Sequence, residues 1–333
     1  MKRFADYLFV TVKGICMGAA DVIPGVSGGT IAFMTGIYEE LVGSINSING
    51  KAVKLLFTGK VKSFWKHING NFLLSLVAGI LISILSLAKL MTYLLEHQPI
   101  QTWAFFFGLI VASSIFILKG ISGWKFKDII MLILGIIIGV VVCTLTPTQT
   151  PDGLWFIFLC GAIAICAMIL PGISGSFILL ILGKYEYMLG TITKITSGDG
   201  TLLDFAVILI FVLGALIGIL AFSRFLHWLL ASYHRATLLV LAGFIIGSLV
   251  KVWPWSDMAT VAASQHPELA ALPSFVWEDV ATKYAGLIDY HIGGAVCFAL
   301  IGFILVVGIE LASNYISKKK GSSPTDADNI QDA

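Results

Sequence analysis

The chain has 333 residues, of which 58% are hydrophobic and 12% charged, and its formal net charge is +2. One long apolar run fits the core of a soluble domain, but this chain has six of membrane length or nearly so, which excludes a soluble protein. The six runs are Phe72–Leu95, Trp103–Leu118, Ile129–Leu145, Phe205–Phe222, Ala236–Val252 and Ile292–Leu311. Helices satisfy their own backbone groups in lipid, so we expect an all-α polytopic membrane protein.

Two further apolar segments contain a repeated motif. PGVSGG, at residues 24–29, recurs 147 residues later as PGISGS, at residues 171–176. The motifs lie in the matching stretches Gly14–Ile45 and Gly161–Ile192, which are identical at twelve of 32 positions. In the first stretch, Gly14–Ile23 and Ser27–Ile37 are each about ten residues long, or about 15 Å of helix, which reaches only the midplane of a bilayer. We therefore predict two re-entrant helical hairpins.

The distribution of basic residues predicts the topology. Lys and Arg are absent from residues 96–102 and 146–153, whereas the following positions are basic: Lys2, Arg3, Lys51, Lys54, Lys60, Lys62, Lys66, Lys119, Lys125, Lys127, Arg224, Arg235 and Lys318–Lys320. Cytoplasmic loops carry the excess of Lys and Arg. We therefore expect both termini in the cytoplasm and a second hairpin that enters from the outer face.

Each half then has one hairpin and three crossings, an odd number that inverts one half relative to the other. The predicted units are residues 1–150 with a hairpin at 14–45, residues 151–317 with a hairpin at 161–192, and a disordered cytoplasmic tail at 318–333. Matches at an offset of 135 residues extend the repeat beyond the hairpins. They are Gly79 with Gly214, Lys89 with Arg224, Thr102 with Thr237, Gly108 with Gly243, and Ser113 with Ser248.

We predict that a helix starts near Ser27 in the first motif and near Ser174 in the second. Each start would present free N–H groups and the positive end of the helix dipole, and the nearby glycines and hydroxyls would let a ligand approach and be hydrogen-bonded. Such a site favours binding of an anion, particularly phosphate. The alternative is that Pro-Gly only kinks helices for packing. The expected phosphate- or substrate-binding residues are Pro24, Gly25, Ser27, Gly28, Gly29, Thr30, Pro171, Gly172, Ser174, Gly175, Ser176, Lys89 and Arg224. Lys89 and Arg224 have the alternative of snorkelling to the interface.

A carboxylate at membrane depth is a candidate for function. Asp21 lies three residues before the first motif, where the second copy has Met168. We expect Asp21 to take part in coupling to H⁺ or Na⁺, with a structural ion pair or helix cap as the alternative. Glu39 and Glu186 follow the hairpins and are expected either to gate access, pairing with Lys89 and Arg224, or to accompany interfacial tyrosines. We expect no catalytic residues, no bound metal, no other cofactor and no nucleic-acid partner.

The stretch GICMGAADVIPGVSGGTIAFMTGIYEELVGSI resembles the signature of a bacterial membrane family formerly catalogued as a domain of unknown function and regarded as polyprenyl-phosphate (undecaprenyl-phosphate) translocases. The resemblance extends from about Tyr7 to Asn314. It implies a flippase of the bacterial cytoplasmic (inner) membrane that returns undecaprenyl phosphate from the outer to the inner leaflet and so recycles the lipid carrier of cell-wall synthesis.

Two alternatives remain. Undecaprenyl-pyrophosphate phosphatases also have re-entrant hairpins, with a PG-x-S-R-S type loop and a Glu-rich motif. This chain has Gly28 and Gly175 where that arginine would stand, and Glu39-Glu40 without a third Glu, which favours carrying phosphate over cleaving it. A small-anion or ion-coupled secondary transporter is the other alternative.

Overall fold

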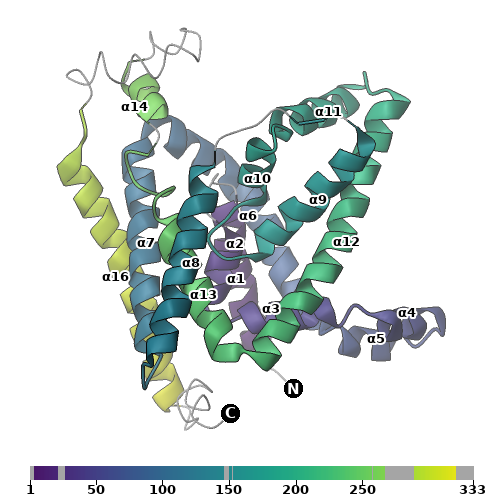
Figure 1. Ribbon diagram of the computed structural model, residues 1–333, viewed down its shortest axis with the longest axis horizontal. Helices are drawn as coiled ribbons and strands as arrows, with labels where there is room; N and C mark the ends of the chain where they lie inside the picture. The colour runs from purple at the N-terminus through teal and green to yellow at the C-terminus, as the bar shows by residue number, and fades with distance from the viewer. Residues whose placement is uncertain are drawn as a thin grey trace.

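The computed structural model describes residues 4–21, 27–145, 150–151, 153–256, 258–266 and 289–319. All regular structure in these residues is α-helical (Figure 1), as expected for this class of membrane protein. The helices are α1 Phe4–Asp21, α2 Gly28–Met34, α3 Tyr38–Asn46, α4 Gly50–Phe57, α5 Val61–His67, α6 Gly70–His97, α7 Pro99–Lys119, α8 Phe126–Thr144, α9 Leu154–Ile169, α10 Gly175–Ile181, α11 Tyr185–Ser197, α12 Leu202–Ser232, α13 His234–Ser248, α14 Met258–Gln265 and α16 Ile292–Lys319.

Each of the six apolar runs forms one helix, namely α6, α7, α8, α12, α13 and α16. Within the described residues, three helices are long and apolar enough to cross a membrane: α7, α8 and α12. Shorter apolar segments lie in α6, α9, α13 and α16. The structure therefore supports a polytopic membrane protein. Of the predicted tail, Lys318 and Lys319 end α16 and the remainder lies outside the described residues.

The two motif segments differ from the predicted pair of ten-residue arms. The first arm, α1, has 18 residues because the apolar sequence continues back to Phe4, and the second, α2, has only seven. The second arm ends early at Gly36, whose φ of +70° is a left-handed conformation that glycine adopts without strain. The second copy ends α10 in the same way, at Gly183 with φ +62°.

Close helix contacts occur in two copies. α1 packs on α6, and α9 packs on α12. In the first pair, a Cβ added to Gly79 would overlap the carbonyl oxygen of Thr11, and in the second a Cβ on Gly214 would overlap that of Phe158. Small residues at such crossings let two backbones approach closely, as in other membrane helix pairs.

The remaining long helices pair between the two halves of the sequence. α16 packs on α7, and α8 packs on α13. Gly108 of α7 faces the carbonyl of Ala299 so closely that no Cβ fits, and Gly243 of α13 faces that of Leu132 in the same way. The third long helix of each predicted unit therefore lies against the other unit.

The turns that lead into α7 and α13 also match. Gln98, before α7, has φ −137° and ψ 51°, and Tyr233, before α13, has φ −136° and ψ 46°. The hydroxyls of Thr102 and Thr237 each donate to two carbonyl oxygens of the preceding helix end, at 2.8–3.3 Å. Residues that match in sequence thus make matching hydrogen bonds.

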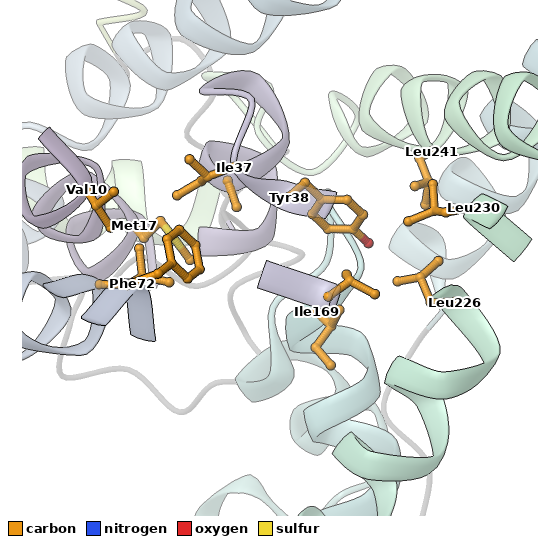
Figure 2. Close-up of a cluster of buried hydrophobic side chains, with 12 residues drawn as sticks. Val10, Met17, Ile37, Tyr38, Phe72, Ile169, Leu226, Leu230 and Leu241 are labelled. Atoms are coloured by element: carbon orange, nitrogen blue, oxygen red, sulfur yellow. The ribbon is translucent and has the colours of Figure 1, made fainter. Parts of the chain in front are cut away.

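A buried apolar cluster joins the two halves around the first motif segment. Figure 2 shows side chains of α1, α3, α6, α12 and α13 meeting the end of α9. Tyr38 lies in this cluster, points toward Ile169 and Leu226 in Figure 2, and is only 2% exposed. Since α3 packs on α12, this cluster holds the end of the first motif segment against the second half of the chain.

At the lower right of Figure 1, α4 and α5 project from the bundle. They occupy the basic stretch between the first hairpin and α6, and they expose Phe57, Val61 and Trp65. Helices with exposed lysines and apolar side chains are typical of a membrane interface.

Candidate functional site

The two repeated motifs, far apart in sequence, touch in the structure. The hydroxyl oxygen of Ser27 lies 3.4 Å from the carbonyl oxygen of Met168 and 3.3 Å from that of Leu170, both at the end of α9. Gly29 lies so close that an added Cβ would be 2.6 Å from the carbonyl oxygen of Ile169. Glycine at this position lets α2 approach the end of α9.

A second hydrogen bond joins the motifs directly. The backbone N–H of Gly172 donates to the hydroxyl oxygen of Thr30 at 2.7 Å. Thr30 is 1% exposed, and Gly172 has φ +100°, a conformation that side chains rarely adopt. The two motifs therefore meet inside the protein through buried polar groups of both copies of the repeat.

The helix starts at Ser27 and Ser174 are confirmed. Each serine is the N-cap residue of its helix and accepts a hydrogen bond there: Ser27 from Gly29 N at 3.0 Å, and Ser174 from Phe177 N at 3.3 Å. Such caps satisfy N–H groups that a helix leaves open at its first turn. The sequence thus locates where both short helices begin.

The prediction of free N–H groups at the start of α2 is wrong. Gly28 N donates to the Oδ1 atom of Asp21 at 2.7 Å, Gly29 N donates to Ser27, and Thr30 N donates to the carbonyl of Ser27 at 2.9 Å. The carboxylate of Asp21 thus already occupies the place of an anion at this helix end. The helix-cap alternative for Asp21 describes its contact in this structure.

The second copy differs at this point. Met168 stands where the first copy has Asp21, so no carboxylate side chain reaches Gly175 from that position. The hydroxyls of Ser174 and Ser176 lie 2.6 Å apart and share a hydrogen bond. Only one of the two hydroxyl hydrogens is used in that bond, so the pair has a donor to spare.

The other predicted residues are placed as follows. Pro171 is buried at the second tip, whereas Pro24, Gly25 and the side chain of Lys89 lie outside what the structure describes. Arg224 is exposed on α12, and Glu186 is exposed on α11.

Glu39 has a different partner from the one expected. Its Oε1 atom lies 3.6 Å from Nε2 of His234, at the start of α13. The geometry therefore does not pair Glu39 with Arg224, and this half-exposed contact joins α3 to the turn between α12 and α13.

Comparison with known proteins shows the family of this chain. A family model described as "VCA0040-like: Undecaprenyl phosphate translocase-like" matches residues 17–270. The chain belongs to this undecaprenyl phosphate translocase-like family. It is 46% identical over 252 residues to a polyprenyl-phosphate transporter of Vibrio cholerae, covering 76% of this chain and 79% of that one. It is 34% identical over 259 residues to a polyprenyl-phosphate transporter of Staphylococcus aureus, covering 73% and 85%. No solved structure matches.

In this member of the family, the structure places Lys251 near the second motif. Lys251 was not among the site residues predicted from the sequence. Lys251 follows α13, and its ammonium nitrogen lies 4.9 Å from the centre of the Phe177 ring in α10. The signal was available, because Lys251 falls inside the apolar run Ala236–Val252 and charged residues in such runs are candidates for function.

Proposed function

We propose that this protein transports polyprenyl phosphate, and that it returns undecaprenyl phosphate from the outer to the inner leaflet of the bacterial cytoplasmic membrane by alternating access. Both curated relatives are named polyprenyl-phosphate transporters, which supports the substrate class. The observation that carries the proposal is the meeting of the two motifs, where Thr30 accepts from Gly172.

A buried polar junction between two hairpins suits a transporter. Ser27, Thr30 and Ser174 are at most 3% exposed, although the surrounding helices are apolar. Burying hydroxyl groups costs free energy unless they are hydrogen-bonded, so such a cluster is usually retained for function. Phosphate fits hydroxyl and N–H donors, while the isoprenoid tail stays in lipid beside the apolar helices.

The repeated contacts support alternating access. The same glycine-to-carbonyl contacts hold α1 on α6 and α9 on α12, and a second set holds α16 on α7 and α8 on α13. In Figure 1, α3 lies toward the lower edge and α11 toward the upper edge, as an inverted repeat requires. Two related units that rock about the hairpin tips would expose the phosphate to each leaflet in turn.

Asp21 is the proposed site of coupling. It is the carboxylate at the first hairpin tip, and it holds the start of α2 through Gly28. A proton or Na⁺ on this carboxylate would weaken that hydrogen bond and so change how α2 is held against the second tip. Binding of the ion at Asp21 would in this way change the substrate site, and an ion gradient could drive transport.

The phosphatase alternative is disfavoured by the space around the motifs. A Cβ at Gly28 would overlap the Oδ2 atom of Asp21, and one at Gly175 would lie 2.8 Å from the carbonyl oxygen of Ala164. An arginine at Gly175 therefore requires a shift of the backbone, and one at Gly28 requires the side chain of Asp21 to move. Without a guanidinium at the tips, the site is better suited to binding phosphate than to stabilising its transfer.

The test is reconstitution of the purified protein into vesicles with labelled undecaprenyl phosphate, scoring both leaflet exchange and phosphate release. Exchange without release supports the proposal. Release of phosphate from undecaprenyl pyrophosphate would support the phosphatase instead, and movement of small ions without lipid exchange would support an ion transporter. Cysteines placed at Ser174 and probed from each side test the topology, because labelling only from the cytoplasm contradicts entry of the second hairpin from outside.

A further inference from the structure

The second motif has a basic neighbour beyond the end of α13. Gly172 packs against this helix end, so that a Cβ on Gly172 would lie 3.1 Å from the hydroxyl oxygen of Ser248. Lys251 follows within one turn, and its backbone N–H donates to the carbonyl of Ser248 at 2.9 Å. The ammonium of Lys251 lies over Phe177, whose own N–H donates to Ser174. This places the positive charge at the first turn of α10.

The ammonium of Lys251 lacks an anionic partner within the part of the chain that the structure describes. Lys251 is half-buried, and its ammonium lies over the Phe177 ring. Two other lysines are satisfied: Lys13, on α1, donates to the carbonyl of Thr35 at 2.7 Å, and Lys184, just before α11, donates to that of Thr150 at 3.0 Å. A cation held partly out of water without a hydrogen-bond acceptor is a strong site for an anion.

The two copies of the repeat carry opposite charges. Asp21 of the first copy corresponds to Met168 of the second, and Lys251 of the second corresponds to Phe116 of the first, at the offset of 135 residues that relates α7 to α13. The first tip therefore has a carboxylate and the second an ammonium. Related sites of opposite charge suit ligands of opposite charge, a cation at Asp21 and an anion at Lys251.

We propose that Lys251, with the hydroxyls of Ser174 and Ser176, binds the phosphate monoester of the transported lipid. This inference rests on the proposed function and assigns the residue that holds its headgroup. An ammonium offers three hydrogen-bond donors and a full charge to phosphate oxygens, and the Ser174–Ser176 pair has one hydroxyl hydrogen to spare. In the predicted topology Lys251 lies toward the outer face, where the lipid is collected.

The experiment uses the full chain in lipid nanodiscs and measures binding of radiolabelled undecaprenyl phosphate. Lys251→Gln should weaken binding at least about tenfold, as expected for losing one charged hydrogen bond. Lys251→Arg should stay within about threefold of the wild type because it keeps the charge. Lys194→Gln, on the exposed end of α11, is the matched control and should not change binding. Unlabelled inorganic phosphate and unlabelled undecaprenyl phosphate are compared as competitors, to separate a lipid headgroup site from one for free phosphate.

A second measurement uses the wild-type protein and so does not depend on the folding of a variant. Bound undecaprenyl phosphate should protect Lys251 from acetylation, read by mass spectrometry, and leave Lys194 modified as before. Wild-type binding by Lys251→Gln, or acetylation of Lys251 unaffected by the lipid, overturns the assignment. Leaflet exchange by the wild type is scored separately. No exchange would refute the proposed function. Normal exchange together with wild-type binding by Lys251→Gln would refute only this inference.

Discussion

Thr30 of the first motif accepts a hydrogen bond from the backbone of Gly172 in the second, at 2.7 Å, across 142 residues of sequence. Both groups are buried, so no water replaces the bond when it is lost. This contact ties the two motif segments to each other. If the protein works by the proposed alternating access, movement of one motif segment relative to the other would break or remake this bond.

Replacing Thr30 with Val tests this contact. The change keeps the shape of the side chain but leaves the buried N–H of Gly172 unsatisfied, which costs about 1–3 kcal/mol. We expect a lower melting temperature in detergent and a changed rate of lipid exchange. Thr35→Val is the control, because the hydroxyl of Thr35 bonds only to carbonyls of its own helix, Ile31 and Ala32. Equal effects of the two substitutions would contradict a special role for the Thr30–Gly172 bond.

The sequence predicts the helices and the positions at Ser27 and Ser174 where the two short helices begin, but not which groups satisfy the N–H groups there. Apolar length and charge bias determine which segments become membrane helices, and the repeated Pro-Gly motif marks where each hairpin breaks. Whether the N–H groups at Ser27 are free depends on where Asp21 points. The structure shows that Asp21 accepts from Gly28 N, a contact between residues seven apart that no periodic pattern in the sequence indicates.

The sequence also did not predict that α8 packs on α13 and α16 on α7. All four helices are apolar on most of their surface, so hydrophobic patterning cannot select partners. Glycines such as Gly108 and Gly243 mark close crossings, yet they do not say which helix crosses. Lys251 is a different case. Its charge inside an apolar run can be read from the sequence, but its position near the second motif is known only from its contact with Phe177 in the structure.

Asp21→Asn separates coupling from structure. The amide oxygen of Asn can still accept the hydrogen bond from Gly28 N, so α2 should stay in place, but the side chain no longer binds a proton or cation by its charge. We expect lipid binding close to that of the wild type and exchange that no longer responds to an imposed pH or Na⁺ gradient. The measurement is exchange in proteoliposomes with and without each gradient. A gradient response as large as that of the wild type would refute coupling at Asp21.

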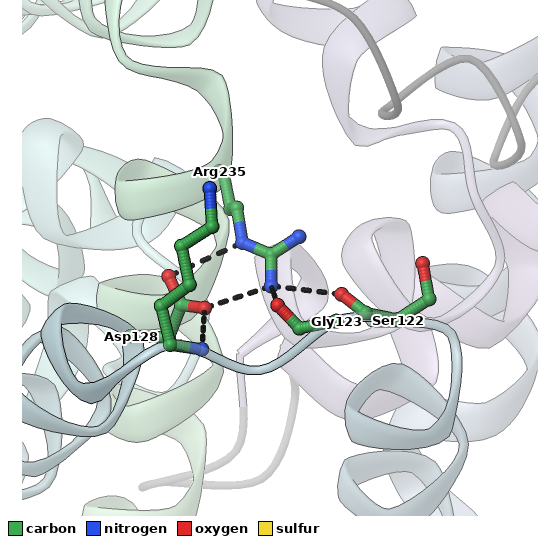
Figure 3. A network of polar contacts seen from close by, with 5 residues as sticks. Ser122, Gly123, Asp128 and Arg235 are labelled. Atoms are coloured by element: carbon green, nitrogen blue, oxygen red, sulfur yellow. Dashed lines mark hydrogen bonds and ion pairs between the residues drawn. The ribbon is translucent and has the colours of Figure 1, made fainter.

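A partly buried ion pair between Arg235 and Asp128 fixes α13 to the start of α8. Arg235 donates to both carboxylate oxygens of Asp128, at 3.1 and 2.7 Å, and to the carbonyls of Ser122 and Gly123 (Figure 3). The side chain of Asp128 is only 9% exposed, so the pair is better protected from solvent than a surface ion pair. It joins the loop after α7 to the other half of the chain.

Arg235→Gln should therefore destabilise the protein by about 2 kcal/mol, since hydrogen bonds to charged groups contribute about 1.5–3 kcal/mol each and Gln retains part of the network. The readout is the free energy of unfolding or the melting temperature in detergent. Arg224→Gln serves as control because Arg224 is exposed on α12, and it should leave stability unchanged. A double variant with Asp128→Asn should cost less than the sum of the single changes, because the two residues share one interaction. Additive losses would show that the pair does not act as a unit.

Two glycines of α16 allow a matched test of helix packing between the halves. A Cβ at Gly302 would overlap the carbonyl oxygen of Phe105 in α7, whereas a Cβ at Gly308 would meet nothing within 4 Å. Gly302→Ala should therefore separate α16 from α7 and lower the melting temperature. Gly308→Ala should leave it unchanged or raise it slightly, because Ala favours a helix over Gly by up to about 1 kcal/mol. If transport depends on α16 staying against α7, Gly302→Ala should also slow lipid exchange while Gly308→Ala does not. Equal stability of the two variants would contradict the close crossing of α16 and α7, by which the third long helix of the second unit packs on the first.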